Sequence, residues 1–214
     1  GFAPTSVPAA AAREGSSAPA PATQPAAKKL KIGVSVPAAD HGWTAGVGWW
    51  AKKAMELHPE IDWVYATALN PEKQTADIED MLVKGVDALV ILATESAPLT
   101  PVAVRAKEKG VFIVNVDRGF LPGPDGQPVA DIFLEGDNKA FGRKSAEFMV
   151  EKLGGKGNIV ILTGIPCTVD TDRTTAAMEV FNRYPGIKVL AQEPGFWSRE
   201  KALAAMENML VKYP

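Results

Sequence analysis

Short apolar runs alternate with amphipathic stretches from Leu30 to the end of the chain. Most of these runs are continuous and rich in β-branched side chains, which is typical of strands that helices cover on both faces. Repeated strand–helix–strand units of this kind require a parallel sheet with right-handed crossovers, so we predict a doubly wound α/β fold. The predicted strands are residues 30–36, 61–66, 88–92, 111–116, 130–134, 158–162 and 187–190.

The stretches between the runs have helical periodicity. One helical stripe consists of Trp43, Val47, Trp50, Ala54 and Leu57, which follow one another at intervals of three and four residues. A second helix is predicted to begin after Asn70 and Pro71, because asparagine is a good N-cap and proline suits the first helical position. Further helices are expected over residues 141–152 and 203–213.

The two ends of the chain differ from this pattern. Residues 1–29 hold ten alanines and five prolines, a composition that predicts a linker rather than a packed domain. Near the other end, Tyr213-Pro214 repeats the start of Tyr184-Pro185, which closes a predicted helix just before a strand. We therefore expect a further strand beyond Pro214 and a missing C-terminal part, the alternative being a natural end on a helix.

Composition excludes several classes of protein. The chain has 214 residues, 46% of them hydrophobic, and a formal net charge of −2, so nothing directs it toward nucleic acid or an anionic membrane. Its single cysteine cannot form an internal disulfide, and its two histidines lack metal-site spacing. Neither a phosphate-binding glycine loop nor a Gly-x-Ser-x-Gly elbow follows a predicted strand. We expect no metal, no cofactor and no catalytic residues.

Ligands of open α/β sheets bind beyond the carboxyl ends of the strands, so those ends identify the candidate site. Aromatic rings pack on the C–H faces of a sugar, while carboxylates and guanidinium groups bond its hydroxyls. Each candidate at a strand end also has a purely structural interpretation. Trp43 could be a core residue, Asp117 and Arg118 an internal ion pair, Arg173 a solvated side chain and Trp197 the cover of a loop. Their convergence favours a neutral polyhydroxylated ligand. The strand ends carry His41, Trp43, Asp117, Arg118, Asp170, Arg173 and Trp197.

The sequence resembles the periplasmic sugar-binding proteins of the ribose and galactose type, the solute receptors of bacterial ABC importers. The resemblance extends in order from Leu30 to Pro214, and the Asp-Arg pair after the fourth predicted strand is its most specific element. The matching segments are residues 32–43, 114–118, 136–142, 164–173 and 192–199.

The resemblance implies two lobes that close over a ligand around a hinge near residues 135–137. The N-terminal lobe would be residues 30–136, and residues 137–214 would be an incomplete C-terminal lobe. Trp43 and Trp197 would sandwich a sugar or polyol. His41, the Asp117–Arg118 pair and Arg173 would supply polar contacts. Cys167, Thr168 and Asp170 stand where other members place their own ligand-reading residues.

The implied partners are the sugar or polyol and an ABC permease, and we expect a monomer that binds no nucleic acid. The expected location is periplasmic or otherwise extracytoplasmic, with a lipid anchor before the linker as one form. Two alternatives remain. A sugar-responsive transcriptional regulator would need a helix-turn-helix ahead of residue 30. An enzyme on a doubly wound sheet would need an acid–base pair, for which the candidates are Asp117, Asp170, His41 and Glu95.

Overall fold

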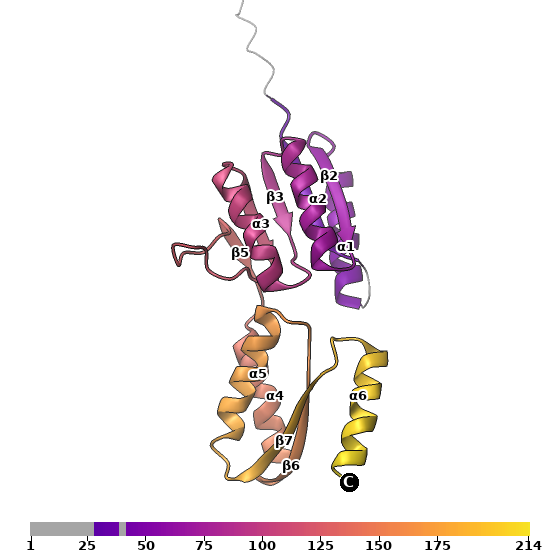
Figure 1. Ribbon diagram of the computed structural model, residues 1–214, viewed down its shortest axis with the longest axis vertical. Coiled ribbons are helices and arrows are strands. Elements are labelled where there is room, and N and C mark those ends of the chain that lie inside the picture. Colours follow the sequence, from indigo (N-terminus) through magenta and orange to yellow (C-terminus); the bar gives the residue numbers. More distant parts are fainter. Residues whose placement is uncertain (1–27, 39–41) are drawn as a thin grey trace, which may run out of the picture.

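The computed structural model describes residues 28–38 and 42–214, which form two parallel β-sheets flanked by helices (Figure 1). The first sheet has the strand order β2-β1-β3-β4-β5, and the second pairs β6 with β7. This confirms the predicted α/β class. The strands are β1 (Lys31–Pro37), β2 (Asp62–Ala68), β3 (Ala88–Ile91), β4 (Phe112–Val116), β5 (Ile132–Leu134), β6 (Lys156–Thr163) and β7 (Gly186–Pro194).

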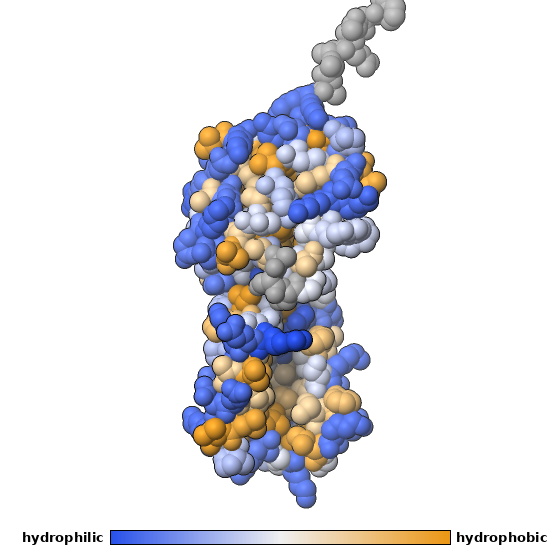
Figure 2. All heavy atoms as spheres, turned by 90° about the vertical axis from the view of Figure 1, so that its right-hand side faces the viewer, coloured by the Kyte–Doolittle hydropathy of each residue, from blue (hydrophilic) through white to orange (hydrophobic). Residues whose placement is uncertain are grey.

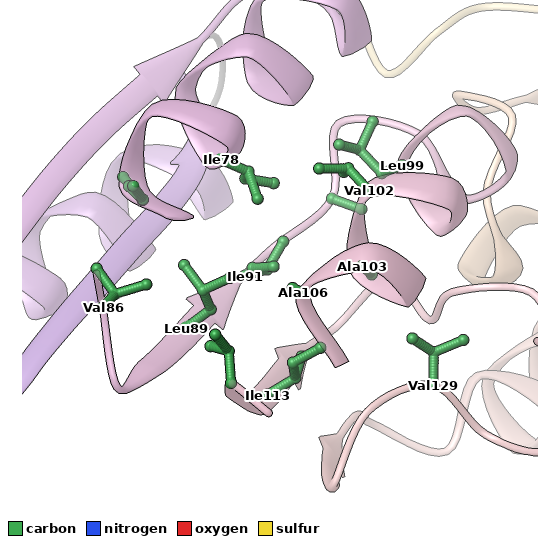
Figure 3. Close-up of a cluster of buried hydrophobic side chains, with 13 residues drawn as sticks. Ile78, Val86, Leu89, Ile91, Leu99, Val102, Ala103, Ala106, Ile113 and Val129 are labelled. Atoms are coloured by element: carbon green, nitrogen blue, oxygen red, sulfur yellow. The ribbon is translucent and has the colours of Figure 1, made fainter. Parts of the chain in front are cut away.

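Helices cover both faces of the five-stranded sheet. On one face lies α1 (Gly42–Leu57), and on the other lie α2 (Pro71–Val83) and α3 (Ser96–Glu108). The α2 and α3 face holds the larger core, in which aliphatic side chains from both helices meet those of β3 and β4 (Figure 3). These side chains bury apolar surface that holds α2 and α3 against the sheet. The members include Ile78, Met81, Leu89, Ile91, Leu99, Val102, Ala106 and Ile113.

The side chains of α1 that face the sheet differ from the predicted stripe. Val47, Ala51 and Met55 pack against the strands, whereas Trp50 and Leu57 are 66% and 64% exposed. Residues 47, 51 and 55 recur every four positions and so lie in one row along the helix. Because this row packs on the sheet, Trp50 in the neighbouring row points to solvent. The predicted helix is therefore present, and of its apolar stripe Val47 packs against the sheet while Trp50 and Leu57 are exposed.

The start of α2 follows the prediction. Asn70 is the N-cap, its side-chain oxygen accepts a 2.9 Å hydrogen bond from the backbone N–H of Lys73, and Pro71 occupies the first helical position. This capping bond satisfies one of the N–H groups that a helix leaves without an internal partner.

The second sheet lies between α4 (Asn138–Lys152) and α5 (Thr168–Phe181) on one side and α6 (Arg199–Lys212) on the other (Figure 1). At the crossing of α4 and α5, a Cβ atom on Gly142 would lie 2.2 Å from the carbonyl oxygen of Arg173. Only glycine lets the two backbones approach so closely. In the described part of the chain, no helix is long and apolar enough to cross a bilayer.

The two parts meet at a narrow waist (Figure 2). The N-terminus of α5 contacts the N-terminus of α3, where the Thr168 N–H donates to Ser96 Oγ at 3.0 Å and the Ser96 N–H donates to the Pro166 carbonyl at 3.3 Å. The Gly119 N–H also donates to Thr168 Oγ1 at 2.8 Å. The chain passes between the parts at residues 135–137, where the hinge is predicted. The linker predicted over residues 1–29 falls almost wholly outside the described residues.

We predict that Gly142→Ala destabilises the protein by about 1–3 kcal/mol, because the new methyl group meets backbone that cannot move aside. Gly46→Ala in α1 is the matched control, since a Cβ atom there meets nothing within 4 Å. Alanine is the better helix former, so this control is expected to be neutral or stabilising. Urea unfolding of both variants measures the difference, and equal midpoints would contradict the close approach.

Candidate ligand-binding site

A cavity of about 660 Å³ lies between the two sheets, at the carboxyl ends of their strands. Its size falls within the range of about 300–1,000 Å³ that is usual for small-molecule sites. Both lobes contribute walls, as does the connection between them. The lining residues are Gly42, Trp43, Val116, Asp117, Arg118, Leu134, Glu135, Gly136, Asn138, Val169, Arg173 and Trp197.

Most of the predicted site residues that the structure describes gather at this cavity. Trp43 and the Asp117–Arg118 pair come from the N-terminal part, and Arg173 and Trp197 come from the C-terminal part. Asp170 is not among the lining residues. Its carboxylate accepts a 2.5 Å hydrogen bond from the Gly164 N–H and so holds the loop after β6. The predicted contact from His41 lies outside the described residues.

Arg118 is the most deeply buried charged side chain of the cavity, with 1% of its surface exposed. Its Nη1 donates to the carbonyl oxygens of Ala93 and Thr94 at 3.1 and 2.9 Å. Its Nε lies 3.9 Å from Asp117 Oδ2. A buried guanidinium is tolerated only when carbonyls and a counter-charge replace its hydration, and this pocket supplies both.

Asp117 has an unusual backbone conformation, with φ at +64°. Its N–H donates to the Leu134 carbonyl at 2.7 Å, which ties the end of β4 to the end of β5. Aspartate and asparagine adopt this left-handed region more readily than other non-glycine residues. The turn aims the carboxylate at the cavity, where Oδ2 accepts a 3.2 Å hydrogen bond from the Trp43 indole N–H.

Trp197 provides the aromatic wall of the C-terminal part. Its φ is +54°, a conformation that a bulky residue adopts only under the constraint of its surroundings. The indole lies against the backbone of Gly164, where a Cβ atom would be 2.2 Å from the ring. The Arg118 guanidinium also lies near the ring, with its Cζ 5.2 Å from the ring centre. Arg118 and Trp197 thus join the two lobes inside the cavity.

Arg173 is held by two side chains of α4. Its Nε donates to Asn138 Oδ1 at 2.9 Å, and its Cζ lies 4.5 Å from the centre of the Phe141 ring. Arginine carries five N–H donors, of which Asn138 engages the one on Nε. Among the described residues no acceptor bonds the Nη atoms, so these four N–H groups are available to a ligand.

Cys167 lies next to the site without lining it. The side chain is 5% exposed, and burial raises the pKa of its thiol. A thiol with a raised pKa is a poor nucleophile at neutral pH. Its backbone caps α5 as the N-cap residue, in an extended conformation. Cys167 is thus the N-cap residue of α5 and is not among the lining residues of the cavity.

Several lining residues were absent from the predicted set. Asn138 and Glu135 flank the connection between the lobes, and the Asn138 amide donates to Glu135 at 3.4 Å. Asn138 could have been found from its place at the start of a helix within the segment that carries the family resemblance. The sequence does not mark Val116, Leu134 and Val169 as lining residues, because apolar residues at the ends of strands and helices usually belong to the core.

The chemistry of the cavity suits a neutral polar ligand. Two guanidinium groups are balanced by two carboxylates, and the rest of the wall is aromatic, aliphatic or amide. No group of three or more metal-ligating side chains occurs within residues 28–38 and 42–214. Such a wall can stack on, and hydrogen bond to, a ring that carries hydroxyl groups.

Comparison with known proteins agrees with this architecture. Residues 32–214 match the family described as the periplasmic binding protein domain. The chain belongs to this family. The family resemblance stated from the sequence is thereby confirmed.

Among curated family members, the chain is 30% identical over 167 residues to the xylitol-binding protein of Mycolicibacterium smegmatis, covering 76% of this chain and 46% of that protein. It is 28% identical to the D-ribose/D-allose-binding protein of Pseudomonas aeruginosa, covering 77% of this chain and 53% of that protein. The chain thus spans about half the length of these two relatives.

Solved structures of the family superpose closely. The fructose-binding periplasmic domain of a hybrid two-component system gives a TM-score of 0.78 at 29% identity, covering 86% of this chain and 60% of that one. The binding protein of the arabinose ABC transporter from Shewanella sp. ANA-3, solved with L-arabinofuranose, gives 0.76 at 25% identity, again covering 86% and 60%. The described fold is therefore part of a type I periplasmic binding protein.

We predict that Asp117→Asn destabilises the protein by about 1–3 kcal/mol, because it removes the counter-charge of a buried guanidinium. Asparagine tolerates the positive φ and keeps an acceptor for the Trp43 indole, so the variant isolates the charge. Asp125→Asn, in an exposed turn, is the control. Urea unfolding of the two variants provides the comparison, and similar losses would argue against an ion pair.

We also predict that Gly164→Ala displaces the Trp197 indole. The control is Gly136→Ala, which lies on the same cavity but meets nothing within 4 Å. The protein has five tryptophans, so a ¹H–¹⁵N spectrum shows up to five indole N–H signals. Gly164→Ala should move the Trp197 signal, assigned with Trp197→Phe, while Gly136→Ala leaves it in place. An unmoved signal in Gly164→Ala would rule out the contact.

Proposed function

We propose that this protein captures a sugar or polyol between its two lobes and delivers it to an ABC import permease. The observation that carries the proposal is the cavity, which has one indole on each lobe and polar groups from both. A site built this way gains its full set of contacts only when the lobes are together, so ligand binding and lobe closure are coupled.

Trp43 and Trp197 would stack on the C–H faces of the ring, as aromatic side chains do with apolar faces. The carboxylate of Asp117 accepts hydrogen bonds from ligand hydroxyls, and the Nη groups of Arg173 donate to them. Arg118 presents its guanidinium at the base of the cavity. Because the charges balance, a neutral ligand leaves no buried charge without a partner. The binding step makes or breaks no covalent bond.

Lobe closure follows from differential affinity. A ligand that touches both lobes binds the closed arrangement more tightly than the open one and shifts the population toward it by that difference. A permease could then distinguish the closed, ligand-bound receptor from the empty one by its surface. The protein would act outside the cytoplasm, where the family's solute receptors meet their ligands.

The comparisons support this proposal through the names of the relatives. Xylitol, D-ribose, D-allose and fructose are the solutes in the names of three similar proteins, and L-arabinofuranose is bound in a fourth. All are neutral polyhydroxylated compounds, in agreement with the charge balance of the cavity. These relatives are named as binding proteins, one of them the component of an ABC transporter, which favours the receptor over the enzyme and regulator alternatives.

The test is a thermal-shift screen with pentoses, hexoses, inositols and alditols, including the solutes of these relatives. A cognate solute stabilises the folded state by mass action, by about 2.7 kcal/mol at roughly 100 times its Kd. Calorimetry then gives the affinity, and chromatography recovers the solute unchanged after long incubation. Conversion of the solute, or no shift with any compound of the panel, would count against capture.

The stacking contribution has its own prediction. Trp43→Ala and Trp197→Ala should each weaken binding of the cognate solute by about 0.5–1.5 kcal/mol, roughly two- to tenfold in Kd. The matched control is Trp50→Ala, since Trp50 lies on the same helix as Trp43, is 66% exposed and does not line the cavity. An equal loss of affinity in all three variants would contradict a role for the Trp43 and Trp197 indoles in the site.

A further inference from the structure

A completely buried amide lies behind the cavity, on a helix that contributes nothing to its lining. Gln74, on α2, is 0% exposed. Its Nε2 donates to the Leu92 carbonyl at 2.8 Å and lies 3.2 Å from Ser35 Oγ, and its Oε1 accepts from the Thr94 N–H at 2.7 Å. An amphipathic helix normally buries aliphatic side chains, so a buried glutamine with this many bonds calls for a specific explanation.

These bonds hold the segment that follows β3. The ladder between β1 and β3 ends at the pair formed by Ser35 and Ile91, and the last bond beyond it runs from the Leu92 N–H to the Ser35 carbonyl. The Leu92 carbonyl and the Thr94 N–H therefore lie outside the sheet. Unpaired buried backbone groups are costly, and the Gln74 amide satisfies one of each kind.

The same segment is the support of Arg118. Arg118 Nη1 donates hydrogen bonds to the carbonyl oxygens of Ala93 and Thr94. Between these two carbonyls in the chain lies the Thr94 N–H, which bonds to Gln74. A peptide unit that rotates moves its carbonyl and its N–H together, because it is planar. Loss of the Gln74 contact would thus release the Ala93 carbonyl, which shares its peptide unit with the Thr94 N–H. This carbonyl is one of the two that fix the guanidinium, which in turn contacts Asp117 and the Trp197 ring.

We propose that Gln74 is a positioning residue of the ligand site, and that it sets the place of the Arg118 guanidinium through the backbone of residues 92–94. This inference rests on the proposed function. Only an amide fits both backbone groups: it carries a donor and an acceptor on one planar group, whereas an ionised glutamate accepts only and methionine donates nothing. The role is indirect, since Gln74 itself does not touch the cavity.

The test compares Gln74→Met with Asn70→Ala. Methionine resembles glutamine in length, so the first variant removes the amide with little change in packing. The second removes the N-cap of the same helix and destabilises α2 without touching residues 92–94. Urea unfolding establishes how much stability each loses. Gln74→Asn, which keeps an amide but is one methylene shorter, replaces Gln74→Met if that variant does not fold.

The first readout needs no solute. The side-chain ¹H–¹⁵N signals of Arg118, assigned with Arg118→Lys, should be dispersed in the parent and Asn70→Ala proteins, and averaged or shifted in Gln74→Met. The second readout is calorimetric titration with D-ribose, D-allose and xylitol. For a probe that binds the parent, Gln74→Met should raise Kd at least tenfold, and Asn70→Ala less than twofold.

The proposal is overturned if Gln74→Met loses stability while its Arg118 signals and its Kd stay those of the parent. It is also overturned if Asn70→Ala raises Kd as much as Gln74→Met does, since the effect would then follow helix stability alone. If none of the three probes binds the parent, the proposed solute class loses its support, while the Arg118 signals still decide the role of Gln74.

Discussion

The buried guanidinium of Arg118 is the interaction on which the two-lobed structure depends. A charge removed from water must recover its solvation from the protein, and here it does so from backbone carbonyls after β3, from the Asp117 carboxylate and from the Trp197 ring of the other lobe. Other contacts hold each of these groups in place: Gln74 bonds the loop after β3, the Leu134 carbonyl bonds the Asp117 turn, and the indole lies against Gly164. A loop, a strained turn and an indole thus stabilise one buried charge together.

Besides the contact of Arg118 with the Trp197 ring, hydrogen bonds join the two lobes. Ser96, Thr168 and Gly119 make three hydrogen bonds across the waist, and each such bond contributes about 1 kcal/mol net. A total of this order is similar to the few kcal/mol that separate the two states of a typical conformational equilibrium. Hydrogen bonds of this total strength are compatible with the proposed coupling of ligand binding to lobe closure.

The layered fold and much of the cavity could be predicted because their signals are local. Continuous β-branched runs identified the strands, and the rule that ligands bind at strand ends brought Trp43, Asp117, Arg118, Arg173 and Trp197 to one place. The other features depend on tertiary structure. Nothing in the sequence shows that Gln74 is buried, that α1 packs through Val47 rather than Trp50, or that Asp170 bonds its own loop.

The two walls of the cavity are built by different means. On the N-terminal side, hydrogen bonds to backbone groups fix the positions of Asp117 and Arg118. On the C-terminal side, Arg173 is oriented by the side chains of Asn138 and Phe141 across a close helix crossing. Side chains change rotamer more readily than backbone segments move. If the proposed site binds a solute, the backbone-held side would therefore set the orientation of the ligand, and the side-chain-held side would have more freedom to adjust to it.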